Sequence, residues 1–598
     1  MTKWKDIFEY IIAQENAMRV PIQVLSGWDF NFREHVRIST LYKHSQFADE
    51  NDKSNKPFKN IVKPVLNLQY RSEDIDVKDI HIYVDDPEKY HLSFLVKKYH
   101  DDVFVLENDL DSYIDQLKES KIDYGGGLSK KLPSQARPEV VALQAIAFCD
   151  QADMMGGPIA VRHFFTPDKL REKKGKWDDK AIDDVILASE DSREPDINRD
   201  TSVKTPGKYI EVYEIHGTLP LRFLEETDSD EWVSQMQIVA FYRSKEKSEN
   251  WFVLYKGRES KWPFKLVQRD AIFGRALGAG GVEELFDAQI WTNYDEIRIK
   301  ELLDAAAKVI FQTGDTAYAN RNKIHDMENL EITITEKGEK IEQIPTAAPV
   351  NIALFERSVR EWYQSAQLIG ASTDPLLGMQ PPSGTPFRLQ ERVVQEGKGT
   401  HDYRRGKFAK HLEEVYRDWI IPHIAKKIVQ GAKFLSELSS QEMQSIAEQI
   451  SENEVNRRVK EKILNGELIL KEEMEELRLK IRSDFQKGGN KKFIEVLKDE
   501  MEGVEFKVKI DIAGKQKDLA AVVDSLSNIF RQVLATPQVL NDPRMAKLLN
   551  TILESSGFSP IDFGTIPVSP IQGLPPTPDS IGALQQPTRG PVKQLLKV

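Results

Sequence analysis

Residues 368–387, LIGASTDPLLGMQPPSGTPF, separate two long helical patterns with a segment that holds three glycines and four prolines. A proline has no amide hydrogen to donate and its ring clashes with the preceding helical turn, so no helix runs through such a segment. The pattern predicts that the first helix ends at Gly370, that Asp374-Pro375 blocks its continuation, and that the next helix begins near Thr385. The chain therefore has to connect two long helices through a loop at this point.

The helical pattern before this loop carries a regular apolar stripe. Within residues 352–370 the apolar side chains recur at spacings of four, three, four and three, at Phe355, Val359, Trp362, Ala366 and Ile369. Such a seam is typical of a helix that packs along a helical neighbour. After the loop, residues 388–433 predict a second long helix with eleven Lys and Arg against six Asp and Glu, kinked near Gly397-Lys398-Gly399.

A third long helical pattern, from about Val282 to Phe311, follows a glycine cluster at residues 274–281. At 1.5 Å per residue this helix would be a rod of about 45 Å. Residues 281–315 contain eight acidic and three basic side chains, and we interpret seven of the acids as an acidic face: Glu283, Glu284, Asp287, Asp295, Glu296, Glu301 and Asp304. No strand pattern precedes the glycine cluster, so we interpret it as a hinge rather than a phosphate-binding loop.

Several segments predict strands. LEITITEKGEKIEQI alternates apolar and polar residues on both sides of Lys337-Gly338, which predicts a β-hairpin. KYIEVYEIHG, SQMQIVAFYRS and NWFVLYKG predict an antiparallel meander, and EFKVKIDI predicts a further strand. Residues 177–204 are rich in Asp, Glu, Ser and Arg and predict an exposed insertion, residues 436–505 predict charged helices, and the last forty residues, with eight prolines, predict a disordered tail.

Composition limits the possible classes of protein. A chain of 598 residues exceeds the size of one core, so several domains of roughly 100–200 residues are expected. With 83 Lys and Arg against 95 Asp and Glu, its net charge of −12 argues against a surface that neutralises many phosphates. The single cysteine, Cys149, excludes internal disulfides and cysteine metal clusters. The N-terminal pattern predicts an amphipathic helix rather than a signal peptide, and no apolar run is long enough to span a membrane.

No sequence feature supports a catalytic or cofactor site. No Gly-Lys pair is followed by Ser or Thr, so there is no P-loop, and the histidines lack metal-ligand spacing. A metal-dependent nuclease would need converging carboxylates and a lysine; Asp196 and Glu211 come nearest, but Tyr213 stands where that lysine is expected. We expect a protein that is not an enzyme and has no cofactor, with a nuclease as the weaker alternative.

The order of elements over residues 276–434 is a long acidic helix, a short hairpin, a helix with a packing seam, a loop rich in Gly and Pro, and a long basic helix. This order resembles the portal proteins of tailed bacteriophages. The run NIALFERSVREWYQSAQLIGASTDPLLGMQPPSGTPFRLQE is similar to their passage from stem to tunnel loop. NKPFKNIVKPVLNLQYRSEDIDVKDI, KIDYGGGLSKK and VVALQAIAFCDQADMMGGPIAVRHFFTPDKL are similar to their wing domain, so the resemblance covers about residues 50–560.

The resemblance implies a mainly helical α+β protomer that assembles with copies of itself into a ring, usually of twelve subunits. The implied parts are a wing region at residues 1–275, stem helices at 276–315 and 352–370, a clip with a β-hairpin at 316–351, a tunnel loop at 371–387, a long kinked helix and charged wing helices at 388–505, a strand and helical crown at 506–558, and a disordered tail at 559–598. Residues 177–204 and 436–505 look like insertions relative to compact portals.

Such a ring, at one capsid vertex, would be the channel through which double-stranded DNA is packaged and ejected without sequence readout. The implied partners are the large terminase subunit, then the head-tail adaptor, and the major capsid or scaffold protein, with no membrane. The protein would be made in the host bacterial cytoplasm and reside in the virion. Acidic stem residues would repel DNA phosphates. The implied channel residues are Leu377, Met379, Gln380 and Ser383, and the implied docking residues of the clip are Arg321, Lys323, Lys337 and Lys340.

Contacts in a head-to-tail ring need two different surfaces on each subunit. The Phe355–Ile369 seam and the acidic helix are the candidates. Other interpretations stay open: a helical head or tail assembly protein that forms no ring, an acidic face that is only solvated, and a Pro-rich linker in place of a tunnel loop.

Overall fold

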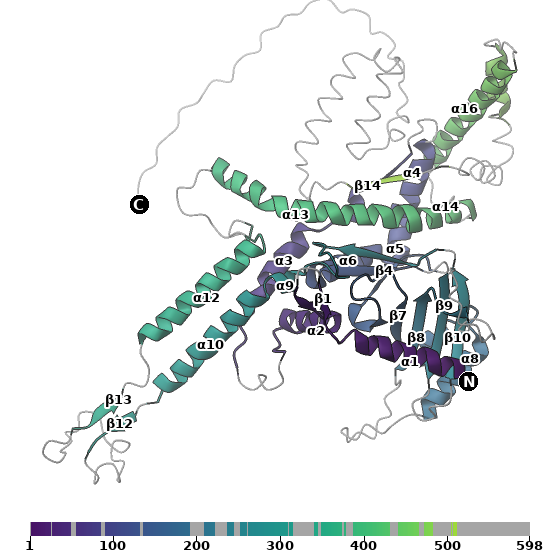
Figure 1. The fold of residues 1–598 in the computed structure, drawn as a ribbon. Helices are drawn as coiled ribbons and strands as arrows, with labels where there is room; N and C mark the ends of the chain where they lie inside the picture. Colours follow the sequence, from purple (N-terminus) through teal and green to yellow (C-terminus); the bar gives the residue numbers. More distant parts are fainter. Residues whose placement is uncertain are drawn as a thin grey trace, which may run out of the picture.

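The chain forms a mixed body of sheets and helices from which a two-helix rod projects (Figure 1). In this computed structural model the described residues are 2–24, 27–48, 56–84, 90–131, 135–191, 209–221, 236–243, 251–259, 261–308, 310–314, 340–344, 349–372, 376–377, 387–430, 440–465, 472–481, 483, 504 and 506–510. The α+β class predicted from the sequence is confirmed for these residues.

A five-stranded antiparallel sheet is the largest sheet of the body, with strand order β10-β9-β8-β7-β6. Its strands are β6 (Ile146–Phe148), β7 (Ile159–Phe165), β8 (Ile210–Gly217), β9 (Met236–Arg243) and β10 (Trp251–Glu259). Strands β8, β9 and β10 pair in sequence order, so the meander predicted from their alternating patterns is confirmed.

Helices cover both faces of this sheet. Successive side chains of a strand point to opposite faces, so each face carries its own apolar side chains and packs against its own helices. Tyr213 and Ile215 of β8 pack in the same core as Ile7 and Ile11 of α1 (Thr2–Ala17). Ile210 and Val212 of β8 pack in a second core with helices α7 (Pro167–Arg171) and α8 (Asp179–Asp191). The prediction of an exposed insertion at 177–204 is therefore wrong for α8, because Ile182, Val185 and Ile186 bury one face of the helix.

A three-stranded sheet, β11-β4-β5, lies against the first core. It consists of β4 (Gly126–Lys130), β5 (Glu139–Val141) and β11 (Phe264–Gln268). The short strands β1 (Ile22–Gln23) and β2 (Asp29–Phe30) pair with each other, and 3₁₀ turns occupy Val77–Asp79 and Leu143–Ala145.

Helices form the other side of the body. They are α2 (Phe32–Lys43), α3 (Val62–Ser72), α4 (Tyr90–Tyr99), α5 (Val105–Asn108), α6 (Leu110–Tyr124), α13 (Phe387–Val415) and α14 (Ile421–Gln430). Helix α6 ends at Tyr124, and Gly125 caps it in the left-handed conformation. Helix α13 crosses the body as one unbroken helix that bends toward its N-terminal end (Figure 1).

The long helix has an irregular turn that the sequence did not predict. The helix continues through Gly397–Gly399, and a π-helical turn at Tyr416–Ile420 separates α13 from α14. Pro422 follows that turn. Because proline has no amide hydrogen, it cannot donate to the carbonyl oxygen one turn earlier, and this accounts for the local change of hydrogen bonding. A second π-helical turn, His100–Phe104, faces it, and His100 Nε2 lies 3.0 Å from the hydroxyl of Tyr416.

Strand β14 (Lys507–Ile510), predicted at EFKVKIDI, pairs with β3 (Ile80–Tyr83) in an antiparallel ladder. The strand assigned to a C-terminal crown at 506–558 therefore completes a sheet of the N-terminal region. The charged helix α16 (Ser440–Leu464) confirms part of the helical prediction for 436–505, and residues 472–481 form a further helix.

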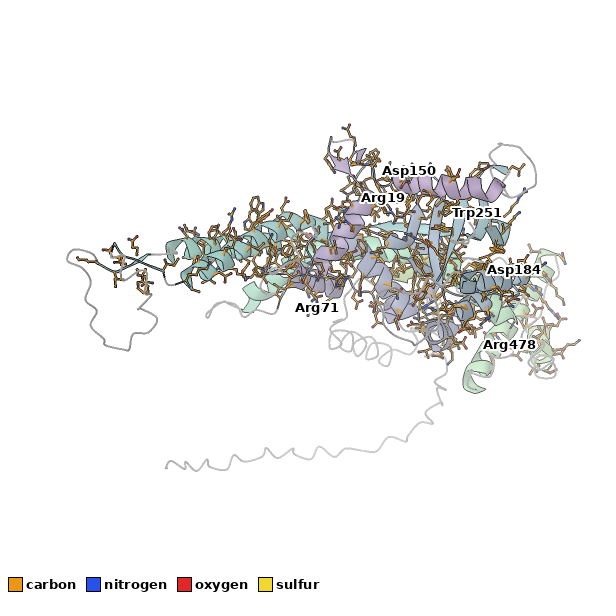
Figure 2. The ribbon with its side chains drawn as sticks, turned by 90° about the horizontal axis from the view of Figure 1, so that it is seen from below. Arg19, Arg71, Asp150, Asp184, Trp251 and Arg478 are labelled. Atoms are coloured by element: carbon orange, nitrogen blue, oxygen red, sulfur yellow. The ribbon has the colours of Figure 1, made fainter. Side chains whose placement is uncertain are left out.

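The rod consists of α10 (Phe286–Ala306), α12 (Pro349–Ile369) and, at its far end, the antiparallel pair β12 (Ile310–Gln312) and β13 (Glu342–Ile344). Figure 2, turned by 90°, shows the rod projecting from the body as Figure 1 does. The helix predicted over Val282–Phe311 breaks at Leu285, after α9 (Gly281–Glu284), and ends at Ala306, because Phe311 lies in β12. Of the predicted hairpin, residues 342–344 form a strand, but their described partner is 310–312, and Leu330–Lys337 lies outside the described residues.

The glycine cluster before the rod is a packed crossing and not a hinge. Gly278 N donates to Gly125 O at 3.1 Å, and Ala279 N donates to Asp270 O at 2.8 Å. A Cβ added to Gly125 would lie 2.0 Å from the carbonyl oxygen of Gly278. A Cβ added to Gly280 would lie 2.5 Å from the carbonyl oxygen of Asp123. Two backbones therefore meet directly where the rod begins, which only glycine allows.

Candidate functional site

The two rod helices pack against each other along their length. Trp291 stacks on Trp362 with ring centroids 6.4 Å apart, and the Ser358 hydroxyl donates to Asp295 Oδ2 at 2.6 Å. The Arg298 guanidinium lies over the Phe355 ring, 5.7 Å from its centroid. The partners run in opposite directions along the two helices, so α12 returns antiparallel to α10.

This packing accounts for most of the seam predicted at residues 352–370. Val359 and Ala366 are buried and Phe355 and Trp362 are half-buried, whereas Ile369 is exposed. Ala366 lies in a core with residues of α3 and α9. The helical neighbour that the seam requires is therefore α10 of the same chain, so the seam is not the free surface for a second subunit that the sequence suggested.

The seven predicted acids divide into two groups. Glu283, Glu284, Asp295 and Glu296 have partners within the chain: Arg275, Arg269 with Arg404, Ser358, and Lys59, respectively. Three acids are exposed on α10: Asp287, Glu301 and Asp304, of which Asp304 lies 3.7 Å from Lys300. Of the seven acids, the three of this second group are the most exposed.

The rod helices carry several large apolar side chains that are exposed to solvent. Two helices cannot bury both flanks of each other, so apolar side chains outside the α10–α12 contact remain in solvent. The exposed large apolar residues of the rod helices are Trp291, Tyr294, Leu303, Leu354, Leu368 and Ile369. Isolated exposed apolar residues need no explanation, but a set on one projecting element indicates an interaction surface.

The far end of the rod carries part of the predicted clip. Ile310 and Phe311 of β12 are 44% and 41% exposed, and Lys340 beside β13 is exposed. Arg321, Lys323 and Lys337 lie outside the described residues. At the near end, Leu377 is half-buried, and Met379, Gln380 and Ser383 lie outside the described residues.

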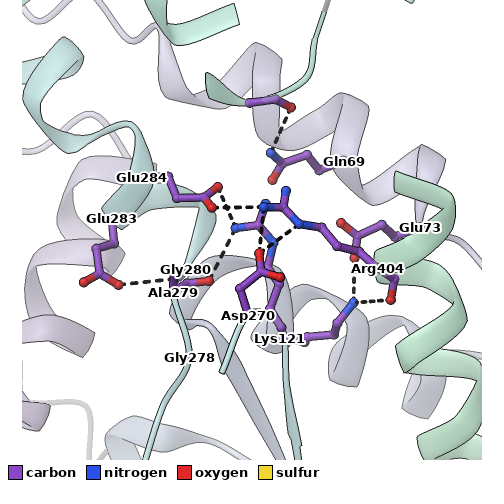
Figure 3. A network of polar contacts seen from close by, with 12 residues as sticks. Gln69, Glu73, Lys121, Asp270, Gly278, Ala279, Gly280, Glu283, Glu284 and Arg404 are labelled. Carbon is purple, nitrogen blue, oxygen red and sulfur yellow. Dashed lines mark hydrogen bonds and ion pairs between the residues drawn. The ribbon is translucent and has the colours of Figure 1, made fainter. Parts of the chain in front are cut away.

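A buried cluster of charges joins the rod to the body (Figure 3). We call it the junction cluster, and its members are Gln69, Glu73, Lys121, Arg269, Asp270, Glu284, His401 and Arg404. It contains three basic side chains, three carboxylates, one amide and one imidazole. They come from α3, α6, α9, α13 and the segment after β11.

Arg404 is at the centre of the junction cluster (Figure 3). Its Nε donates to Asp270 Oδ2 at 2.9 Å and its Nη2 donates to Glu284 Oε1 at 3.0 Å. Arg269 Nη1 donates to the other oxygen of Glu284 at 2.9 Å. Lys121 Nζ donates to Glu73 Oε2 at 2.6 Å and to the carbonyl oxygen of Arg404 at 3.2 Å.

The electrostatics of the cluster follow from burial. The side chains of Lys121 and Glu73 are both 0% exposed. Burial lowers the pKa of Lys121, and the adjacent Glu73 carboxylate opposes that shift. A buried pair of this kind is costly to break, because removal of one partner leaves an uncompensated charge in a low dielectric.

The rod joins the body at two places, which we call its roots: α9 on the outgoing side and the end of α12 on the returning side. The returning root also bonds to the junction cluster. Helix α12 ends at Ile369, so the predicted stop at Gly370 is confirmed. Gln69 Nε2 donates to Gly370 O at 3.3 Å, and His401 Nε2 donates to Ala371 O at 3.0 Å. Ala371 has a φ of +51°, the left-handed conformation that often terminates helices.

The basic helix α13 uses its charges within the chain. Arg404 and Lys407 face Asp270, at 2.7 and 3.8 Å. Arg405 pairs with Asp402 at 2.9 Å. Arg404, Arg405 and Lys407 therefore pair with acidic side chains of the same chain.

Sequence analysis missed the junction cluster, although one signal was present. Lys121 stands four residues after Leu117 on the apolar stripe of α6, where the pattern calls for an apolar residue. Arg404 likewise stands four residues before buried Phe408. A charged residue on an apolar stripe indicates a buried partner, but the identity of that partner depends on tertiary packing.

Five buried histidines predict that stability falls with acid. Burial lowers the pKa of His35, His100, His216, His401 and His411, and that of His411, also beside Lys265 and Lys121, falls to about 3. These histidines bind protons near pH 6.5 in the unfolded chain but only at lower pH in the folded chain. The stability that they contribute is therefore present above pH 6.5 and is lost below it. The loss is at most about 1.4 kcal/mol per pH unit for each histidine.

We therefore expect the midpoint of thermal unfolding to fall between pH 7 and pH 5, and to fall less in His411→Leu. Carboxylates with lowered pKa values, such as Glu214 and Glu283, would lose their contribution only below their ordinary value of 4.5. A midpoint that does not change between pH 7 and pH 5 would contradict the prediction.

The nuclease candidates do not converge in the structure. Glu211 accepts from the Tyr213 hydroxyl at 2.6 Å and lies 3.6 Å from Arg162, and Asp196 lies outside the described residues. Among the described residues no group of His, Cys, Asp and Glu has the geometry of a metal site. None of the helices in this described part could span a membrane.

The solved structures that resemble this chain include two from gene transfer agent particles. No family model matches the chain, and no curated protein matches it. A chain in a structure of the virion of a native gene transfer agent particle is 8% identical, with a TM-score of 0.33, and the match covers 78% of this chain and 98% of that one. A chain in the neck of an empty gene transfer agent particle is 10% identical, with a TM-score of 0.34, over 71% of this chain and 94% of that one.

Proposed function

We propose that this chain is a portal-type protomer, copies of which close into a ring around a channel for double-stranded DNA. The observation that carries the proposal is the antiparallel rod. The chain leaves the body through α9 and α10, turns in a small β-containing tip, returns through α12 and continues into the long helix α13. The described elements support this proposal because two antiparallel helices with a β-containing tip, followed by a long helix, match the described part of the order that the resemblance implies.

The exposed apolar residues of the rod support assembly with further copies. Each rod would bury flanks that it cannot bury alone, and a head-to-tail arrangement uses a different flank on each side. The resemblance gives twelve as the usual number of subunits.

The exposed acids Asp287, Glu301 and Asp304 suit a channel through which DNA slides. Negative side chains repel phosphates and keep binding weak, whereas a basic lining would hold the duplex. In this proposal Leu377, Met379, Gln380 and Ser383 face the channel.

The rod tip would be the docking site for the terminase large subunit and later for the head-tail adaptor. Lys340, together with Arg321, Lys323 and Lys337, would supply its positive charge. The body would contact the major capsid or scaffold protein at one capsid vertex of the virion, after synthesis in the host cytoplasm.

We expect negative-stain images of the purified chain to show closed rings with a central hole. Tyr294→Glu and Leu303→Glu place charges on exposed rod positions and are expected to shift rings to monomers or small oligomers. Leu106→Glu is the matched control, since Leu106 is 78% exposed on α5, away from the rod. A monodisperse monomer under several salt conditions would overturn the proposal and favour an assembly protein that forms no ring.

A further inference from the structure

Both roots of the rod meet one buried cluster. On the outgoing side, Glu284 of α9 bonds to Arg404 and Arg269. On the returning side, Gly370 O accepts from Gln69 and Ala371 O accepts from His401. His401 and Arg404 are three residues apart on α13, so one turn of one helix contacts both roots.

The roots themselves are interrupted, so their helices alone do not set the direction of the rod. Leu285, with φ −99° and ψ 0°, separates α9 from α10. At the other root α12 stops at Ile369, and Ala371 adopts a positive φ. The angle of the rod to the body is therefore set by contacts across its base, which are the apolar core shared with α3 and the hydrogen bonds of the junction cluster.

The junction cluster supplies contacts that resist rearrangement. Its three cations, Lys121, Arg269 and Arg404, balance its three carboxylates, and a shift of one root would leave a buried charge without its partner. Arg404 matters most because its guanidinium reaches Asp270 and Glu284 at once. A lysine has a single ammonium and does not reproduce this forked geometry.

We propose that the junction cluster is the joint that fixes the orientation of the rod on the body, and that Arg404 is its positioning residue. The joint exists in a single chain. Its consequence for function rests on the proposed ring, in which the angle of each rod would set the width of the channel.

Spin labels can measure the angle of the rod in the full chain. The single cysteine, Cys149, is buried, and burial raises the pKa of its thiol to about 12, so cysteines introduced at exposed positions label selectively. Lys340→Cys marks the rod tip and Lys180→Cys marks α8 of the body. Dilution with unlabelled chain leaves only the distance within one chain.

We expect one narrow distance distribution in the labelled parent. Arg404→Met should broaden it about twofold or shift it, because a joint with unpaired carboxylates has several arrangements of similar energy. Arg404→Lys should have a smaller effect. Arg405→Met is the control, since Arg405 lies on the same helix and, among the described residues, its ion pair is with Asp402 within α13.

If Arg404→Met does not fold, Glu284→Gln provides the test, because it keeps the shape of the side chain and removes the charge that links α9 to α13. A folded Arg404→Met or Glu284→Gln variant with the parent's distribution would overturn the joint. Images of the same samples test the ring separately: the distance result stands whether or not rings form.

Discussion

Gly125→Ala is expected to lower the free energy of unfolding of the body by about 3–5 kcal/mol, combining backbone strain with overpacking. Gly125 has a φ of +79°, and an added Cβ would lie 2.0 Å from the carbonyl oxygen of Gly278 and 2.8 Å from the carbonyl carbon of Ala279. These neighbours are backbone atoms that no side-chain rotation can move. Chemical unfolding followed by tryptophan fluorescence would measure the loss.

Gly175→Ala separates strain from clash in this experiment. Gly175 has nearly the same φ, +81°, but nothing lies within 4 Å of an added Cβ. We expect this variant to lose only the strain of a left-handed alanine, about 1–2 kcal/mol. Equal losses in the two variants would show that the crossing of Gly125 with Gly278 is not tightly packed.

The glycine crossing marks a limit of sequence interpretation. Two glycine clusters, at residues 125–127 and 274–281, are plain in the sequence, but a pattern gives no sign that they touch. The second was therefore interpreted as a hinge. Glycine allows both free rotation and close approach, and only the position of the other backbone decides between them.

Local periodicity predicted several of the described elements. The meander β8-β9-β10, the amphipathic helix α1 and the end of α12 at Ile369 follow from apolar spacing and from chain breakers, which act within a few residues. Errors arose where a distant segment decides the outcome. Phe311 continued a helical pattern but pairs in a strand with Gln343, and the acidic segment of α8 hides an apolar face that packs on the five-stranded sheet.

The candidate site divides in the same way. Two long helical patterns and the seam predicted the two rod helices. The sequence suggested that the seam packs against another subunit, whereas α10 of the same chain packs against it. Five of the seven predicted acids have a partner within the chain, because a count of charges does not show which carboxylates meet a cation or a hydroxyl. The channel residues Met379, Gln380 and Ser383 and the clip residues Arg321, Lys323 and Lys337 stay predictions, as they lie outside the described residues.

Glu73→Ala is expected to cost about 3–5 kcal/mol of stability, because among the described residues it leaves the fully buried Lys121 with the carbonyl oxygen of Arg404 as its hydrogen-bond acceptor. It also leaves three cations facing two carboxylates in the junction cluster. The loss should appear in unfolding followed by circular dichroism, and in faster amide exchange of α3 and α6.

The double variant Glu73→Leu with Lys121→Met tests whether that loss comes from the unpaired charge. It removes both charges, so the cluster keeps Arg269 and Arg404 against Asp270 and Glu284 and stays neutral. Replacement of a buried pair by apolar residues of similar volume is often neutral or stabilising, so we expect the double variant to recover most of the stability lost in Glu73→Ala. A double variant as unstable as Glu73→Ala would mean that Glu73 acts through packing or through hydrogen bonds beyond Lys121, and the electrostatic account of the junction cluster would then be wrong.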